Sequence, residues 1–350
     1  MRILVINPGA TSTKVAVYSE HGAVHQAVID HAYDAIRAFR HVNDQIEYRL
    51  GAITDWLRSV GVNLDELDGF SGRGGLIRHV ESGTYEVNEA AVADALSSSR
   101  QHPANLGIVL AARLAAQCGK KAFFTDPVST DEWPDFVHLS GFAPVDRACY
   151  FHALNQKAMA KKAAKILDIP YENARLIVIH MGGGISVGAH LAGRVVDVFN
   201  VMDEGGFSLN RSGSIPVAGL VSYCFSGLPE AEVKRQIQTR GGFLSYLDTQ
   251  DFREIEARLK SEDKKAGQVY AAFIWQLTKD VGAMAAVMSF RVDGVVLTGG
   301  MAHSDMLRQN LTERLENLAP IIPLPGECEM EALAEGALDA LKYGAKTYDS

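Results

Sequence analysis

Three glycine-rich stretches of the chain carry residue types that can bind phosphate. They are NPGATSTK at 7–14, HMGGGIS at 180–186 and TGGM at 298–301. The backbone N–H groups of such bends can form anion-binding concavities, although a single glycine-rich bend is more often only a tight turn. Together the three favour a ligand that contains phosphate.

The first stretch shares one feature with a P-loop, because Lys14 follows Gly9 by five places. A P-loop requires a second glycine directly before its lysine and a helix directly after it. Here Thr13 precedes the lysine, and the run that follows, 15–18, is apolar and typical of a strand. With RILVIN before the bend, the sequence predicts a β-hairpin and excludes a P-loop.

Two arginines lie beside small residues, Arg73 in RGG and Arg211 in NRSG. Glycine beside arginine leaves the guanidinium room to reach a ligand. The planar fork of the guanidinium matches a carboxylate or phosphate in two-point contact. For each arginine, a solvated surface position is the alternative interpretation.

Asp126 and His152 are the other candidates for chemistry. Asp126 follows an apolar run in FFTDPV. An acid at the carboxyl end of a strand can hold hydrated Mg²⁺ together with substrate phosphates, and a strand-terminating turn is the alternative. His152 lies near the start of the helix predicted for YFHALNQKAMAKKAAK, where a lone histidine is usually structural.

Composition limits the class of protein. The chain has 350 residues with 47% hydrophobic content, which is enough for two domains with separate cores. The net charge of −8 and the lack of a basic tract argue against nucleic acid as a partner. The four cysteines form no CxxC pair, and the longest uncharged stretches, 176–193 and 212–229, are interrupted by Gly, Ser, His or Pro. We therefore expect a cytoplasmic protein with no membrane partner.

Two segments half a chain apart share one architecture. Residues 2–25 and 175–198 each give an apolar strand, a polar residue (Asn7 or His180), a bend rich in Gly, Ser or Thr, and two further strands. This similarity predicts an internal duplication. Two such domains facing one another would place a glycine-rich bend on either side of a cleft.

Helices are predicted for most of the remaining chain. Apolar residues recur at helical spacing within 46–57, 106–114, 269–288 and 330–341, and the last of these predicts a final amphipathic helix. The strand pattern at 293–300 ends on two glycines, which would let the backbone approach a flat ligand such as a purine. Strands, helices and then strands again predict an α/β protein.

The motifs, taken in chain order, resemble one family. They are INPGATSTKVAVY, GRGGL, TDPV, YFHALNQKAMA, IHMGGGISVGAH, NRSGSIP, LTGGMAHS and PGECEMEALAEGAL. This series is similar to the butyrate kinases, in the acetate kinase branch of the superfamily that includes sugar kinases, Hsp70 and actin, and it covers nearly the whole chain. The resemblance implies duplicated actin-like (ribonuclease H-like) domains with ATP and Mg²⁺ in the cleft between them. It also implies transfer of the γ-phosphoryl group to a short-chain fatty acid.

The resemblance implies roles for residues at matching positions. Arg73 and Arg211 match the catalytic arginines of the family. Asp126 matches its essential aspartate, and we also expect Asp126 to contact the metal. His152 matches its active-site histidine. The residues expected to contact the nucleotide lie in the first hairpin (Asn7, Thr11, Ser12, Lys14), in the second hairpin (His180, Gly182, Gly183, Gly184) and at the adenosine (Gly299, Gly300, Met301).

Glu329 matches the metal-linked glutamate of the family, but the nearby Glu327 and Glu331 leave the register open. Two departures from the family pattern occur: Cys328 replaces an expected Asn, and GFSLNRSGSIP differs from PFSPERSG. The first bears on the Glu329 assignment and the second on the acyl pocket.

The duplication and the final helix predict two domains, 1–125 with 333–350, and 126–332. The expected partners are ATP or ADP and a short-chain carboxylate, and we expect a homodimer or a higher homo-oligomer. An acetate or propionate kinase of the same family is one alternative, and an ATPase switch of the actin or Hsp70 kind is another. Because a carboxylic acid with a pKa near ~4 is already ionised at neutral pH, a kinase acting on it needs no general base. It needs positive charge instead, which favours direct, reversible in-line transfer.

Overall fold

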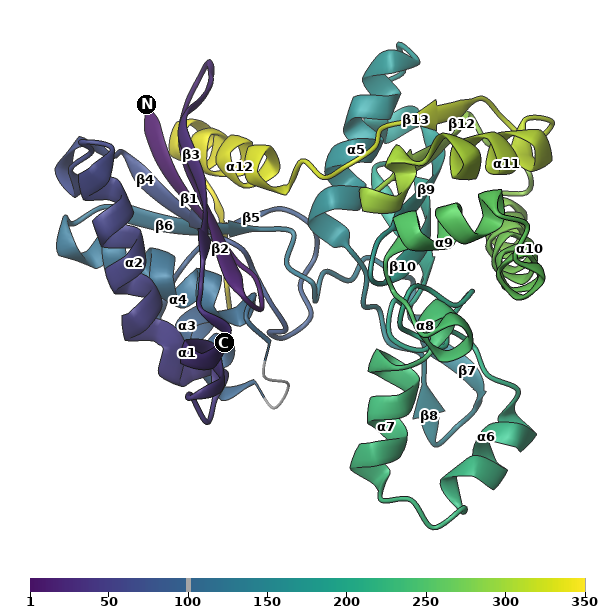
Figure 1. The fold of residues 1–350 in the computed structure, drawn as a ribbon. Coiled ribbons are helices and arrows are strands. Elements are labelled where there is room, and N and C mark those ends of the chain that lie inside the picture. The colour runs from purple at the N-terminus through teal and green to yellow at the C-terminus, as the bar shows by residue number, and fades with distance from the viewer. Residues whose placement is uncertain (99–101, 350) are drawn as a thin grey trace. The chain divides into compact units, whose positions relative to one another are not determined.

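The computed structural model describes residues 1–98 and 102–349 (Figure 1). They form two compact units, Met1–Asp131 with Cys328–Ser350, and Glu132–Glu327. The domain boundaries expected from the sequence, at 125/126 and 332/333, stay a prediction. Within the described ranges, no helix has an apolar run long enough to cross a membrane.

The first unit contains one mixed sheet. Its strands are β1 (Arg2–Pro8), β2 (Ser12–Ser19), β3 (Gly22–Asp30), β4 (Gly69–Gly72), β5 (Thr84–Glu86), β6 (Lys121–Thr125) and β14 (Lys346–Thr347). They lie in the order β14-β5-β6-β4-β1-β2-β3. The hairpins β1–β2 and β2–β3 are antiparallel, whereas β4 pairs parallel with both β1 and β6.

The sheet of the second unit repeats this pattern. Its strands are β9 (Arg175–Met181), β10 (Ile185–Leu191), β11 (Arg194–Phe199), β12 (Gly294–Thr298) and β13 (Ile321–Pro323), in the order β11-β10-β9-β12-β13. Two antiparallel pairings are followed by two parallel ones, as in β3-β2-β1-β4-β6. The predicted hairpins and the predicted duplication are therefore confirmed. A separate small hairpin joins β7 (Leu139–Phe142) to β8 (Val145–Asp146).

The helices predicted from apolar spacing are also confirmed. They are α2 (Ile46–Ser59), α4 (Asn105–Gln117), α10 (Lys264–Val287) and α12 (Glu329–Tyr343), and α5 (Ala153–Ile166) begins directly after His152. The remaining helices are α1 (Tyr33–Arg37), α3 (Glu89–Ser97), α6 (Val217–Cys224), α7 (Glu230–Thr239), α8 (Gly242–Leu247), α9 (Phe252–Lys260) and α11 (Asp305–Leu315).

Helices α4 and α12 pack on opposite faces of the first sheet. Alternation along β4 sends Phe70 into the core that contains Leu106 of α4, whereas the Ser71 hydroxyl donates to the Leu333 carbonyl of α12 at 2.8 Å. In Figure 1 the last helix accordingly lies on the other side of this sheet from α2 and α4. The chain thus returns to the first unit at its end.

In the second unit, α10 and α5 pack on the sheet. Ile177 and Ile179 of β9 share one core with Phe273 and Leu277 of α10. Helix α5 contacts β9 and β12. Buried apolar runs of this kind follow from a sheet that is covered by helices.

Glycines let α4 approach the end of β4 closely. A Cβ at Gly72 would lie 2.0 Å from the Gly107 carbonyl oxygen, and a Cβ at Gly107 would lie 2.3 Å from the Arg73 carbonyl oxygen. Real side chains do not fit at such distances. The position of the Arg73 backbone therefore depends on a glycine in α4.

We predict that Gly107→Ala lowers the free energy of unfolding by about 1–3 kcal/mol, because its methyl group would push Arg73 and β4 away from α4. Gly51→Ala is the matched control, since Gly51 also lies within a helix but no atom would lie within 4 Å of its Cβ. The control should gain about 0.5–1 kcal/mol from helix propensity alone. Urea unfolding of both variants measures the difference, and equal gains would contradict the packing argument.

Candidate active site

The bend between β1 and β2 turns two amides outward. The Gly9 N–H donates to the Ser12 carbonyl and the His31 N–H to the Thr11 carbonyl, both at 2.8 Å. Among the residues that the structure describes, the N–H groups of Ala10 and Thr11 donate no hydrogen bond, and both residues are exposed. Adjacent amides of this kind suit an anion.

Three polar side chains from distant parts of the chain meet beside this bend. Asn7 Nδ2 donates to Glu329 Oε2 at 2.8 Å, and Arg73 Nη1 donates to the same oxygen at 2.9 Å. Arg73 Nη1 also lies 3.3 Å from Asn7 Oδ1. Glu329 is the first residue of α12, where the helix dipole favours a carboxylate. Lys14 pairs with Asn7 across the hairpin, so both residues face the same side of the sheet.

The three neighbouring glutamates have different surroundings. Glu329 is buried against Asn7 and Arg73. Glu327 lies in the second unit with its Oε1 3.9 Å from His180 Nε2, and Glu331 is exposed on α12. Glu329 is therefore the glutamate that lies beside Asn7 and Arg73, and its contact with a metal stays a prediction.

Asp126 adopts an unusual backbone conformation directly after β6. Its φ of 40° is uncommon for a residue other than glycine. Its Oδ1 accepts hydrogen bonds from Ser82 Oγ at 2.6 Å and from the Gly83 N–H at 2.8 Å. Such strain is found preferentially at functional sites. A Cβ at Gly74 would lie 2.5 Å from Pro127 Cβ, so the Arg73 and Asp126 loops pack together.

The glycines of RGG have a different purpose from the one expected. The sequence suggested that they leave room for the guanidinium. In the structure, Gly74 meets Pro127, and a Cβ at Gly75 would lie 2.0 Å from Asn105 Oδ1. These glycines are therefore required by backbone packing.

In the second unit, His152 and His180 stack with ring centroids 3.7 Å apart and planes 12° apart. His152 Nδ1 lies 2.8 Å from Ser186 Oγ, to which Gln156 Nε2 donates at 2.8 Å. Gln156 Oε1 in turn lies 3.1 Å from His190 Nε2. Burial lowers the pKa of His190 to about 3, so this ring is neutral at physiological pH. A buried polar network therefore fixes the orientation of His152.

The bend between β9 and β10 lies against Arg211. The Gly182 N–H donates to the Gly184 carbonyl at 3.0 Å, and Ser208 Oγ donates to the Gly183 carbonyl at 2.7 Å. A Cβ at Gly184 would lie 2.5 Å from Arg211 Nη1, which donates to the Val201 carbonyl at 2.9 Å. Burial lowers the pKa of the Arg211 guanidinium. Arg211 is therefore partly buried and held by a backbone carbonyl, and its catalytic role stays a prediction.

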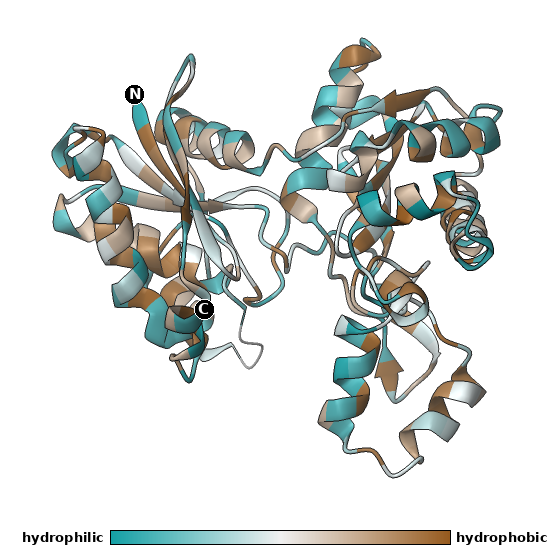
Figure 2. Ribbon diagram, in the orientation of Figure 1, coloured by the Kyte–Doolittle hydropathy of each residue, from teal (hydrophilic) through white to brown (hydrophobic). Residues whose placement is uncertain are grey.

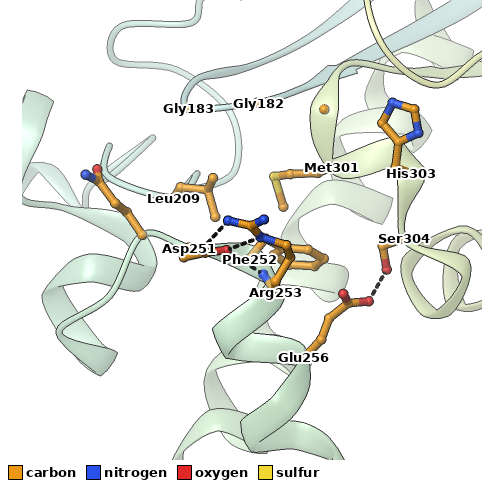
Figure 3. Close-up of a pocket in the computed structure, with 12 residues that line it drawn as sticks. Gly182, Gly183, Leu209, Asp251, Phe252, Arg253, Glu256, Met301, His303 and Ser304 are labelled. Atoms are coloured by element: carbon orange, nitrogen blue, oxygen red, sulfur yellow. Dashed lines mark hydrogen bonds and ion pairs between the residues drawn. The ribbon is translucent and has the colours of Figure 1, made fainter.

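A pocket of about 820 Å³ lies beside this bend (Figure 3). Its volume is within the range that binds small molecules. The lining includes residues expected from the sequence and residues that it did not indicate: Gly182, Gly183, Leu209, Gln250, Asp251, Phe252, Arg253, Glu256, Gly300, Met301, His303 and Ser304. Figure 3 shows the Met301 side chain directed toward Leu209 and Arg253.

Gly299 and Gly300 differ in their surroundings. Gly299 has a φ of 86°, and a Cβ there would lie 2.3 Å from the Met181 carbonyl oxygen. This glycine therefore permits close packing of β12 against β9. Gly300 has no atom within 4 Å of a Cβ and lines the pocket, so it leaves space for a ligand.

The fit of a magnesium ion rests on two carboxylates. In residues 1–98 and 102–349, no three His, Cys, Asp or Glu side chains form a metal-binding group by themselves. Asp126 and Glu329 each use one carboxylate oxygen in the hydrogen bonds described above. Mg²⁺ is usually held by one or two carboxylates together with water and substrate phosphates. The two carboxylates therefore fit a Mg²⁺ ion that binds together with a nucleotide.

Comparison with known proteins gives consistent results. Residues 146–322 match the model of the acetokinase family. A protein named "Probable butyrate kinase" from Clostridium botulinum (strain Alaska E43 / Type E3) is 41% identical over 343 residues, which cover 97% of each chain.

Two solved structures share the fold. Acetate kinase from Porphyromonas gingivalis matches with a TM-score of 0.81 at 21% identity, over 97% of this chain and 99% of that chain. A propionate kinase from Francisella tularensis subsp. tularensis SCHU S4 matches with a TM-score of 0.75 at 18% identity, over 96% and 98% of the two chains. The duplicated actin-like α/β fold expected from the sequence is thereby confirmed.

The loop that leads to Arg211 is held by a buried acid. Asp280 Oδ2 accepts the Gly206 N–H at 2.6 Å, and burial raises the pKa of Asp280 from 3.8 to about 6. The folded protein therefore binds this proton more tightly than the unfolded chain does. The buried charge therefore lowers the free energy of unfolding by its full amount above about pH 6. This loss of stability disappears as the pH falls below 3.8.

We predict that Asp280→Asn stabilises the protein at about pH 8 by at most ~3 kcal/mol, because the amide oxygen keeps the Gly206 hydrogen bond without the buried charge. The gain should shrink at about pH 4.5, where the carboxyl group is largely protonated in the folded state. Chemical unfolding at both pH values measures this. A gain that does not change with pH would show that the charge is not its cause.

Proposed function

Because the chain belongs to the acetokinase family and is a phosphotransferase, we propose that it transfers the γ-phosphoryl group of ATP to the carboxylate of butyrate or a branched analogue. The products would be an acyl phosphate and ADP, and the reaction would be reversible. The observation that carries this proposal is the near full-length similarity to the clostridial protein named a butyrate kinase. The more distant solved structures are those of an acetate kinase and a propionate kinase, which makes acetate or propionate the alternative substrate.

The chemistry supports a carboxylate as the acceptor. Its oxygen is already ionised at neutral pH, so no residue has to remove a proton. The obstacle is repulsion between this anion and the charged phosphoryl group. Preorganised cations and N–H groups lower that barrier by stabilising charge in the transition state.

We assign the residues accordingly. The outward amides at Ala10 and Thr11, with Ser12, Lys14 and Asn7, would bind phosphates, as would the bend Gly182–Gly184. The pocket at Gly300 and Met301 would hold the adenosine. Arg73, Arg211 and His152 would stabilise charge on the transferring group. Mg²⁺ held through Asp126 and Glu329 would neutralise charge on the phosphates.

The fixed orientation of polar groups within each unit supports direct in-line transfer. Arg73 is fixed by Glu329 and Asn7, and His152 is fixed by Ser186, so each is oriented before substrate binds. Such preorganisation lowers the reorganisation needed during the reaction. No covalent intermediate on the protein is required.

We also propose that the chain forms a homodimer or a higher homo-oligomer. Helix α6 has no buried residue, and Val217 and Phe225 are 75% and 87% exposed. Figure 2 shows hydrophobic residues on α6 and on β7. Exposed apolar side chains that lie together mark interaction surfaces. Sedimentation equilibrium should show at least twice the mass of one chain, and a monomer would contradict this proposal.

The cytoplasmic location expected from the sequence stays a prediction.

Trapping with hydroxylamine tests the proposed reaction. Incubation with ATP, Mg²⁺ and butyrate should give butyryl hydroxamate in an amount that depends on the protein. Specificity constants for acetate, propionate, butyrate, isobutyrate and valerate should be highest for butyrate or isobutyrate. A specificity constant that is highest for acetate would favour an acetate kinase instead. Phosphate release that does not depend on a carboxylate would identify an ATPase switch of the actin or Hsp70 kind.

We predict that Arg211→Ala lowers kcat by about 10³ or more, because this arginine would act mainly on charge in the transition state. Arg211→Lys should recover only a small part, since one charge remains without the planar fork. Arg235→Ala, which removes an exposed arginine of α7, is the control and should keep wild-type kinetics. A rise of KM for butyrate with unchanged kcat in Arg211→Ala would assign Arg211 to substrate binding instead.

A further inference from the structure

Arg49 is a charged residue buried in the core of the first unit. It lies on α2 among the apolar positions Ile46, Leu50 and Ile53, and its exposed fraction is 0%. A buried guanidinium is normally paired with a carboxylate, because an unpaired buried charge is costly. Within the described part of the chain no carboxylate pairs with Arg49, although its pKa of about 10, lowered by burial, keeps it charged at neutral pH.

The hydrogen bonds of Arg49 go instead to neutral oxygens. Nε and Nη2 donate to Gln45 Oε1 at 3.0 and 2.8 Å, which fixes the guanidinium relative to its own helix. The two terminal nitrogens, Nη1 and Nη2, also reach the bend between β1 and β2. Nη2 donates to the carbonyls of Gly9 and Ala10 at 3.0 and 3.2 Å, and Nη1 donates to the Ser12 carbonyl at 3.1 Å.

Two further contacts complete this arrangement. Arg49 Nη1 donates to Thr13 Oγ1 at 2.8 Å, and the same hydroxyl lies 2.8 Å from His31 Nε2. The Thr11 carbonyl accepts from the His31 N–H. All four carbonyls from Gly9 to Ser12 are therefore held by hydrogen bonds, three of them by one guanidinium.

The consequence concerns the opposite side of the bend. Since successive peptide groups direct their carbonyls toward Arg49, the N–H groups of Ala10 and Thr11 are left facing solvent. The guanidinium also places a positive charge behind these amides, in a region where screening by water is weak. Both effects make the bend attractive to an anion.

We propose that Arg49 is a positioning residue that holds this bend in the conformation that binds the phosphates of the nucleotide. The inference rests on the proposed function, because it takes the ligand of the bend to be a nucleotide phosphate. Arg49 would touch no substrate itself. Its loss should therefore weaken binding in proportion to the phosphates that the ligand carries.

Binding of ADP and of AMP, each with Mg²⁺, tests the proposal by calorimetry. Arg49→Met keeps the apolar stem but removes the charge and all donors, and it should weaken ADP binding at least about tenfold more than AMP binding. Arg49→Lys keeps the charge but loses the fork, so its ADP affinity should fall between those of the wild type and Arg49→Met. Arg58→Met on the same helix, where the side chain is 75% exposed, is the control and should bind both ligands normally.

The outcomes separate this inference from the proposed function. An equal loss of AMP and ADP affinity, or no loss, in variants with wild-type circular dichroism would overturn the role of Arg49 while the kinase assignment stands. If Arg49→Met does not fold, the ADP-to-AMP ratio of Arg49→Lys decides. Failure of the wild type to bind ADP would overturn the proposed function, and this inference would fall with it.

Discussion

One carboxylate oxygen, Oε2 of Glu329, accepts hydrogen bonds from both Asn7 and Arg73. These residues come from the first strand, from the loop after β4 and from the start of the last helix. Because the carboxylate is buried, losing Arg73 would leave its charge without a cation beside it, which is costly. The parallel pairing of β1 with β4 and the return of α12 to this sheet are both needed to bring the three groups together.

The proposed transfer to a carboxylate would account for the polar groups that are fixed on both bends. An anionic acceptor can approach a phosphoryl group only where cations and N–H groups are already oriented toward the transition state. In the first unit a buried arginine orients the bend, and in the second unit Ser208 holds the Gly183 carbonyl. The duplicated topology is thus supported by different side chains in each half.

Much of the fold could be predicted from the sequence, because its signals are local. The hairpins follow from apolar runs on either side of glycine-rich bends, and the helices follow from apolar spacing. Local patterns could not show which of Glu327, Glu329 and Glu331 lies beside Asn7, since this depends on which turn of α12 meets Asn7. The positive φ of Asp126 and the stacking of His152 on His180 also arise from tertiary packing, which no local pattern encodes.

Arg49 is a residue whose importance the sequence signals but does not explain. It falls on the buried face of α2, three places after Ile46, and a charge on an apolar stripe is a signal that something must compensate it. The glycines of RGG and Gly299 are a different case. The sequence shows these glycines, but only the distances in the structure show that they permit close backbone packing.

The central claim is that a carboxylate oxygen attacks the γ-phosphorus of ATP directly. Phosphorus NMR of a reaction with ATP, Mg²⁺ and butyrate labelled with oxygen-18 in its carboxyl group tests it. Direct attack should give ADP and an acyl phosphate whose phosphorus signal carries the isotope shift of the labelled bridging oxygen. Label recovered in AMP, or unlabelled phosphate released at the same rate without butyrate, would contradict it.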